Sequence, residues 1–223
     1  CRGAPAPHPL LQDPATEGHA MTTQTDAPAA AEAARPRYAW LRRMLHWAVA
    51  LFLVALIPSG LIIAGYERAT VESVDGLFGE GAFDVLYDLH KSAGLTVLGL
   101  MVLRVVAKAA APNPDYTPPL KAWEAKASRL VHSALYGLLI VTPIIGWLGV
   151  SLYPAPAPFW FLVDLRLPIG EARGASEALL SYAHAPLAIL LGILAAVHVL
   201  AALKHRLLNR DGVWERMAPP KRD

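Results

Sequence analysis

Four stretches of this chain are almost entirely apolar and long enough to cross a lipid bilayer. They are Leu45–Ala64, His90–Ala110, Leu130–Val150 and Tyr182–Leu203. A transmembrane helix needs about 20 predominantly apolar residues to cross a hydrocarbon core of about 30 Å. Pro58 and Pro143 lie inside the first and third stretches, where we expect local kinks because membrane helices tolerate proline. The pattern predicts an all-α membrane protein built as a four-helix transmembrane bundle.

The segments outside these stretches have a different composition. Residues 1–34 are rich in Ala, Pro and Thr and have no periodic apolar pattern, so we expect a disordered N-terminal tail. This tail lacks the basic and then apolar stretch of a secretory signal peptide, and Met21 is a candidate start residue. We expect the four-helix domain to cover residues 35–210 and a cytoplasmic C-terminal tail to cover residues 211–223.

The composition excludes several classes of protein and several kinds of site. Of the 223 residues, 55% are hydrophobic and only 17% are charged, which is too apolar for an ordinary soluble domain. The net charge is only +2, so we expect membrane lipid around the chain and no nucleic-acid partner. The single cysteine, Cys1, excludes an intrachain disulfide, a four-cysteine metal site and covalent haem attachment through C-x-x-C-H.

The charges alternate between the segments that connect the spans. Arginines precede the first span, and lysines and arginines dominate both the second connection and the segment after the fourth span. The first connection is acidic and carries Glu67, Glu72, Asp75, Glu80, Asp84 and Asp88. Because positive residues gather on the cytoplasmic side of membrane proteins, we expect both termini and the second connection to be cytoplasmic.

Two histidines in the fourth span, His184 and His198, are fourteen residues apart. Along a helix this spacing covers about 21 Å and falls about 40° short of four full turns, so both imidazoles project from nearly the same face. Ionisable groups at such depth are costly and usually mark a functional site. Two stacked b-type haems, held non-covalently and each taking one ligand from this helix, would use that spacing.

Two further histidines match these depths. His46 opens the first span at its cytoplasmic edge, and His90 opens the second span on the opposite side. Depth therefore pairs His46 with His198 and His90 with His184, and each pair can supply both axial ligands of a six-coordinate haem. The alternative is that His46 and His90 are interfacial histidines that face lipid headgroups.

Other residues on the same helical stripes can support two haems. Gly60, fourteen residues after His46, leaves room for a macrocycle on the far side, or packs helix against helix. Leu191 would fill the gap between the haems. Arg104 can bind a haem propionate at the cytoplasmic edge, and Lys91 is the equivalent residue on the far side; either can instead extend to the headgroups.

Two histidines of the four-helix domain remain outside the pairs. His132 opens the third span at its cytoplasmic edge, and fourteen residues later the chain has Gly146. His205 lies in a basic cluster seven residues after His198. Either could donate a hydrogen bond or a proton to a quinone beside the cytoplasmic haem, although a surface histidine in a basic cluster is usually only solvated.

Several short motifs occur in a specific order and spacing. They are R-R-M-L-H-W (Arg42–Trp47), L-H-K-S-A-G (Leu89–Gly94), L-R (Leu103–Arg104), H-S-A-L-Y (His132–Tyr136), P-I-I-G-W (Pro143–Trp147), H-V-L-A-A-L-K-H (His198–His205) and R-D-G-V-W-E-R-M (Arg210–Met217). From Arg42 to Met217 the chain resembles the bacterial cytochrome b561 family of di-haem, four-helix membrane proteins. The resemblance implies haem ligation by the same two pairs, His46 with His198 and His90 with His184. The connection around Pro154, Pro156 and Pro158 is the region that matches the family least clearly.

The family resemblance implies an oxidoreductase of the bacterial inner membrane. Superoxide on the periplasmic side would reduce the far-side haem, and the electron would pass through the cytoplasmic haem to ubiquinone. Lys91, Arg166 and Arg173 could attract an anion, while the acidic first connection opposes it. A second hypothesis is a cytochrome b anchor that links quinone to a periplasmic hydrogenase, dehydrogenase or small redox partner. A third, a histidine-lined metal or proton transporter, would need acidic residues in the span interiors, which have none.

Overall fold

The computed structural model describes residues 3, 37–65, 67–110, 113–114 and 119–218. The chain divides into two units, Cys1–Ala34 and Arg35–Asp223. Apart from Gly3, every described residue belongs to the second unit. The tail predicted for residues 1–34 therefore lies outside the described residues.

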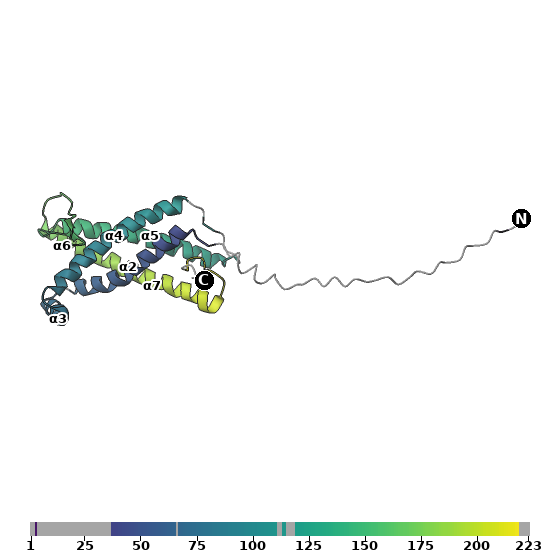
Figure 1. The fold of residues 1–223 in the computed structure, drawn as a ribbon, viewed down its shortest axis with the longest axis horizontal. Coiled ribbons are helices and arrows are strands. Elements are labelled where there is room, and N and C mark those ends of the chain that lie inside the picture. The colour runs from purple at the N-terminus through teal and green to yellow at the C-terminus, as the bar shows by residue number, and fades with distance from the viewer. Residues whose placement is uncertain (1–2, 4–36, 66, 111–112, 115–118, 219–223) are drawn as a thin grey trace. The chain divides into compact units, whose positions relative to one another are not determined.

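Four long helical segments form the second unit, as Figure 1 shows. The first three are α2 (Trp40–Ala64), α4 (Ala82–Ala110) and α5 (Ala122–Ser151). The fourth is a continuous rod that consists of α6 (Arg173–Leu179), a π-helical turn η1 (Leu180–His184), α7 (Ala185–Lys204) and a second π-helical turn η2 (His205–Asn209). In the described part of the chain these four are the helices long and apolar enough to cross a membrane. The predicted four-helix transmembrane bundle is confirmed.

Every spanning helix begins earlier than its apolar stretch. The first turns of these helices contain charged residues, such as Arg42 in α2, Asp84 in α4 and Glu124 in α5. Because a helix bonds its own backbone, it can continue past the hydrocarbon into the polar headgroup region without exposing unpaired groups. The expectation that His46, His90 and His132 open their helices was therefore wrong, since all three lie at least six residues inside.

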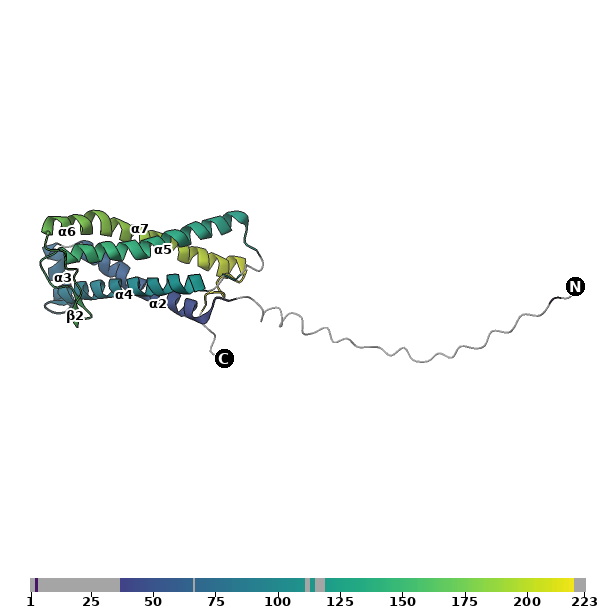
Figure 2. The ribbon, with the colours of Figure 1, turned by 90° about the horizontal axis from the view of Figure 1, so that it is seen from above.

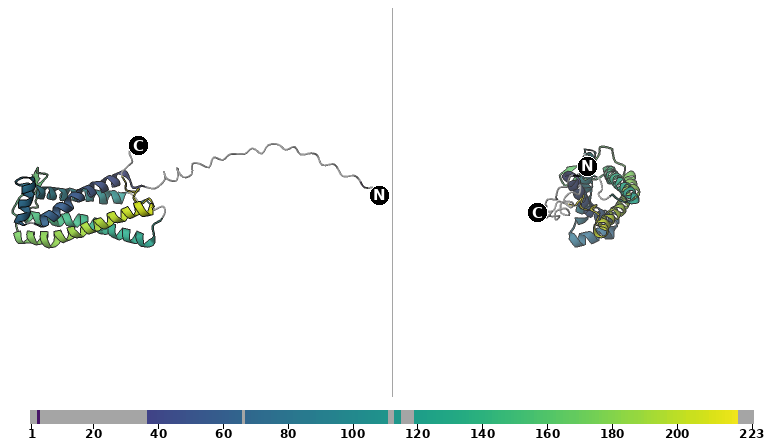
Figure 3. Two further views of the ribbon diagram at one scale, coloured as in Figure 1. Left: turned by 90° about the horizontal axis from the view of Figure 1, so that it is seen from below. Right: turned by 90° about the vertical axis from the view of Figure 1, so that its right-hand side faces the viewer.

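The four helices surround a small apolar core. α2 packs along α4, α4 along α5, α5 along α7, and α7 along α2, so the helices form a closed ring (Figures 2 and 3). The buried core residues are Val49, Val97, Met101, Leu135, Leu139 and Leu191. Leu191 lies halfway between His184 and His198 in sequence, and its side chain is buried.

The connections distinguish the two ends of the bundle. A short helix, α3 (Arg68–Phe78), joins α2 to α4. A two-stranded antiparallel hairpin, β1 (Pro158–Phe159) and β2 (Val163–Asp164), joins α5 to α6. Figures 1 and 2 show α3, the hairpin and α6 at one end, which we name the hairpin end. The sequence did not predict this hairpin.

The first and last described segments of the bundle meet at the other end, which we name the N/C end. The backbone N–H of Tyr38 donates to the carbonyl oxygen of Arg216 (3.2 Å), and Trp47 Nε1 donates to the carbonyl oxygen of Met217 (2.8 Å). Residues 211–218 thus pack against the start of α2. The bundle begins and ends on the same side, as four crossings require.

Candidate functional site

At the hairpin end, His90 of α4 faces His184, the last residue of η1. Their ring centroids are 6.3 Å apart. Each ring is held by a hydrogen bond at Nδ1: that of His90 lies 3.0 Å from Ser59 Oγ, and that of His184 lies 3.0 Å from the carbonyl oxygen of Thr142. Since the Ser59 hydroxyl donates to the carbonyl oxygen of Ala55, its oxygen is free to accept the proton of His90. Both rings then carry their proton on Nδ1 and leave Nε2 as a ligand atom.

Two glycines let these rings lie against neighbouring backbones. A Cβ added at Gly60 of α2 would lie 3.1 Å from Cε1 of His90, and one added at Gly146 of α5 would lie 2.8 Å from Nδ1 of His184. Gly60 therefore contacts an imidazole, whereas the sequence suggested that it makes room for a macrocycle. The contact of Gly146 with His184 was not predicted, although the sequence shows this glycine fourteen residues after His132.

At the N/C end, His46 of α2 faces His198 of α7. Their ring centroids are 6.1 Å apart. Each pair thus connects the fourth helix to another helix. The partner helix is α2 at the N/C end and α4 at the hairpin end. Along that helix the pairs are about 21 Å apart, from the rise of fourteen helical residues.

Both pairs have the separation that one metal ion between them requires. A metal–imidazole bond is about 2.0–2.1 Å and a ring centre lies about 1.1 Å from its atoms, so two opposed imidazole ligands have centroids about 6.3 Å apart. The separations of 6.3 Å and 6.1 Å agree with this value. Within the described residues, no group of three or more His, Cys, Asp or Glu could hold a metal ion. The spacing within each pair would fit one haem iron, held by one histidine of the fourth helix and one histidine of α2 or α4.

Arg104 of α4 lies beside the N/C-end pair and fits a haem carboxylate. Its guanidinium lies 5.4 Å from the centre of the Tyr136 ring, and its buried Nη1 has no hydrogen-bond partner among the described residues. A small cavity lined by Arg42, Arg104, Tyr136 and Met217 opens there. A buried guanidinium N–H without an acceptor is costly. A carboxylate such as a haem propionate would satisfy it.

Lys91 is held by other groups. Its ammonium lies 2.7 Å from the Asp88 carboxylate and donates to the carbonyl oxygen of Pro156 (3.4 Å). A propionate would have to compete with Asp88 for this charge. The role of Lys91 as a propionate ligand stays a prediction.

The two other histidines among the described residues, His132 and His205, lie at different depths near the N/C end. The ring of His132 is 5.0 Å from that of His198, which is too short for a metal ion between opposed ligands, and its Nδ1 bonds the carbonyl oxygen of Ser128 at 2.6 Å. His205 lies two turns further along the fourth helix, where its Nδ1 is 2.6 Å from Asp211 Oδ2. The structure thus places His132 beside the N/C-end pair and His205 nearer the end of the bundle.

The groups around Asp211 change the pKa of its carboxyl group. Burial alone would raise its pKa, but hydrogen bonds from His205, from the Val213 backbone N–H and from Asn209 together lower the pKa of this carboxyl below its usual value. The sequence analysis missed this His–Asp pair because its members are six residues apart and meet only where the chain turns at Arg210, which has a φ of 51°.

Comparisons with known proteins place the chain among cytochromes b. The model of a family described as prokaryotic cytochrome b561 matches residues 37–220. Cytochrome b561 homolog 1 of Escherichia coli strain K12 is 27% identical over 187 residues, which cover 83% of this chain and 99% of that protein. Cytochrome b561 homolog 2 of the same strain is 28% identical over 181 residues, or 81% of this chain and 90% of its own. The probable superoxide oxidase CybB of Yersinia pestis is 26% identical over 188 residues, or 83% of this chain and 98% of its own.

Proposed function

The chain belongs to the prokaryotic cytochrome b561 family, a family of transmembrane electron transfer, and from this premise we propose that it carries electrons from periplasmic superoxide to ubiquinone at the cytoplasmic side of the bacterial inner membrane. The proposal rests on two histidine pairs at two depths of one bundle. The ring centroids within these pairs are 6.1 Å and 6.3 Å apart. We assign His46 and His198 to one b-type haem and His90 and His184 to the other. When bound, these haems supply one-electron redox centres.

The protein's own residues orient and separate the two sites. Ser59 and the Thr142 carbonyl fix the hairpin-end rings through Nδ1. Arg104 would hold a haem propionate at the N/C end. The helical rise between His184 and His198 sets their spacing at about 21 Å. The buried side chains of Leu191, Met101 and Val97 keep water out of the space between.

The distribution of charge supports the orientation and the donor. The basic segments at the N/C end favour the cytoplasm for that end, so the hairpin end faces the periplasm. Superoxide is suggested by the similarity to the probable superoxide oxidase CybB. Of the cations at this end, Lys91 and Arg166 are in ion pairs with Asp88 and Asp164, whereas the guanidinium of Arg173 lies 4.9 Å from the centre of the Tyr153 ring. We therefore propose that Arg173 attracts the anion.

Quinone reduction needs electrons and protons at the same place. Two superoxide ions lose one electron each and become dioxygen, and one ubiquinone takes the two electrons with two protons and becomes ubiquinol. His132 lies beside the N/C-end pair, which would deliver the electrons, and the His205–Asp211 pair lies nearer the end of the bundle, where cytoplasmic protons would enter. We propose that the quinone head group binds on this half of the bundle.

Superoxide generated by pulse radiolysis, with the haem absorbance of the purified protein followed in time, tests the donor. We expect rapid reduction, then re-oxidation when ubiquinone is present, and a much slower reaction in His90→Ala. Reduction no faster than with heat-inactivated protein would reject superoxide. A periplasmic redox protein would then be the donor, as in the anchor hypothesis.

A further inference from the structure

The turn of the β-hairpin has an unusual conformation. Trp160 and Phe161 occupy its two central positions with φ of 49° and 62°, and the N–H of Leu162 donates to the carbonyl oxygen of Phe159 at 3.0 Å. This left-handed region favours Gly, Asn or Asp, and bulky side chains there are strained. Strain of this kind persists only where the surrounding structure enforces it. We therefore expect both aromatic side chains to make contacts that Gly or Asn could not make.

Trp160 attaches the hairpin to the bundle. Its backbone N–H donates to Ser92 Oγ at 2.8 Å, and its Nε1 donates to Thr96 Oγ1 at 3.1 Å. Its ring centroid lies 6.5 Å from that of Phe52 in α2. The hairpin thus crosses the side of α4 and reaches α2.

These contacts place the tip at the depth of the membrane. Ser92 and Thr96 lie about 3 and 9 Å further along α4 than His90, toward the N/C end. Phe52 lies between His46 and Gly60, well inside the apolar span of α2. Leu51 and Val54 of α2 are each 73% exposed, so this helix has a surface that can face lipid at the depth of Phe52.

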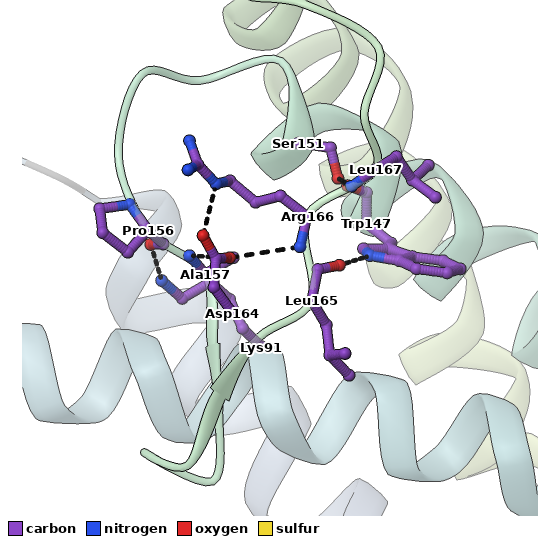
Figure 4. Close-up of polar contacts among 9 residues, drawn as sticks. All are labelled: Lys91, Trp147, Ser151, Pro156, Ala157, Asp164, Leu165, Arg166 and Leu167. Atoms are coloured by element: carbon purple, nitrogen blue, oxygen red, sulfur yellow. Dashed lines mark hydrogen bonds and ion pairs between the residues drawn. The ribbon is translucent and has the colours of Figure 1, made fainter.

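Polarity changes from the base of the hairpin to its tip. At the base, Lys91 pairs with Asp88, and Arg166 pairs with Asp164 (Figure 4 shows Lys91, Asp164 and Arg166). At the tip, Phe161, Leu162 and Val163 are 54%, 85% and 50% exposed. A charged base and an apolar tip match the step from headgroups to acyl chains.

Several polar backbone groups at the base of the hairpin are bonded within the protein. The carbonyl oxygen of Leu165 accepts from Trp147 Nε1 at 2.6 Å, and the N–H of Ala157 donates to Asp164 Oδ1 at 3.1 Å (Figure 4). The carbonyl oxygen of Pro158 accepts from Ser92 Oγ at 3.2 Å, and Pro156 and Pro158 have no N–H to satisfy. Irregular backbone at membrane depth requires such partners, because lipid offers none.

We propose that the hairpin Pro158–Asp164 is a lipid anchor: Trp160 fastens it to α4 and α2, and Phe161, Leu162 and Val163 insert into the outer leaflet of the bilayer. Its occupant is the headgroup and acyl-chain boundary of the lipid. The anchor braces the wall formed by α2 and α4, which carries His46 and His90. This inference does not depend on the identity of the electron donor or acceptor.

Spin labelling in the bilayer tests the anchor. A nitroxide at position 162 (Leu162→Cys in a Cys1→Ser background) is compared with one at position 171 (Glu171→Cys), which is exposed on the same connection. The full chain is reconstituted in vesicles of phosphatidylethanolamine and phosphatidylglycerol, and collision rates with dissolved oxygen and with a water-soluble nickel chelate are measured. We expect oxygen to dominate at position 162 and the nickel chelate to dominate at position 171.

Other outcomes overturn the proposal. A label at position 162 that collides mainly with the nickel chelate lies in water. An immobilised label that neither reagent reaches is covered by protein, and dipolar broadening would identify that protein as a second copy of this chain. Because the Leu162 side chain is 85% exposed, its replacement should leave the fold intact, and an unchanged haem spectrum verifies this.

Discussion

Gly146 lies directly against His184: a methyl group on the glycine would come within 2.8 Å of Nδ1 of the imidazole. Real Cβ atoms are not found so close to a ring nitrogen, so the contact depends on the absence of a side chain. The same Nδ1 makes the hydrogen bond to the Thr142 carbonyl oxygen, one turn earlier on α5. A single helix thus fixes the orientation of a ring carried by its neighbour.

Gly146→Ala should displace His184 and weaken or abolish binding of the hairpin-end haem. We expect about half of the haem to be lost, because the N/C-end pair is untouched. Pyridine haemochrome quantitation of the purified variant measures this. Gly137→Ala is the matched control, since a Cβ there meets nothing within 4 Å, and it should stabilise α5 by up to about 1 kcal/mol. Two haems retained in both variants would contradict the assigned role of Gly146.

Arg104→Ala should lower the midpoint potential of the N/C-end haem. A cation near the macrocycle favours the reduced form, which carries one more negative charge, so its removal favours the oxidised form. The expected shift is tens of millivolts, on the order of 1 kcal/mol for a partly screened charge. Redox titration followed by optical spectroscopy measures it. Arg104→Lys keeps the charge and should restore most of the potential; equal shifts in both variants would show that charge is not the cause.

Acidification should loosen the segment that follows η2. The pKa of Asp211 is below its usual value in the folded protein, so this carboxylate adds stability above its ordinary pKa of about 3.9 and loses that contribution as the pH falls through the lowered value. The N–H of Val213 donates to Asp211 Oδ1 at 3.3 Å and reports this change. Hydrogen exchange should show less protection of that amide below about pH 3.9 than at neutral pH. Asp211→Asn should remove the pH dependence, and an unchanged dependence would assign it to another group.

His132 and His205 are proposed to have different roles at the quinone site, and kinetics can separate them. His132→Ala should raise the KM for ubiquinone if the ring beside His198 contacts the head group. His205→Ala should lower kcat instead, because His205 and Asp211 are proposed to deliver protons. Steady-state quinone reduction with both variants separates the two effects, and photo-crosslinking with an azido-quinone locates the head group. Crosslinks confined to residues 67–89 would move the site to the other end of the bundle.

The parts of the fold that depend on local properties could be predicted from the sequence. Hydropathy gave the four spans, and helical rise gave the depths of His46, His90, His184 and His198. The contacts between helices could not be predicted in the same way. Ser59, Thr142 and Gly146 act on residues of other helices, so their roles depend on how the helices rotate and pack.

The hairpin and the first residues of the helices also could not be predicted from the sequence patterns. A turn with Trp160 and Phe161 at its centre lacks the Gly or Asn that normally signals a hairpin. The helices begin earlier than predicted because charged residues such as Asp84 and Glu124 are compatible with helix in the headgroup region, where hydropathy no longer marks the boundary.

The central claim is that each haem is shared by two helices, with His46 paired to His198 and His90 paired to His184. Redox titration of His46→Ala, His90→Ala, His184→Ala and His198→Ala tests it most directly. We expect His46→Ala and His198→Ala to lose one redox component, and His90→Ala and His184→Ala to lose the other. Loss of the same component in His46→Ala and His90→Ala would contradict the pairing.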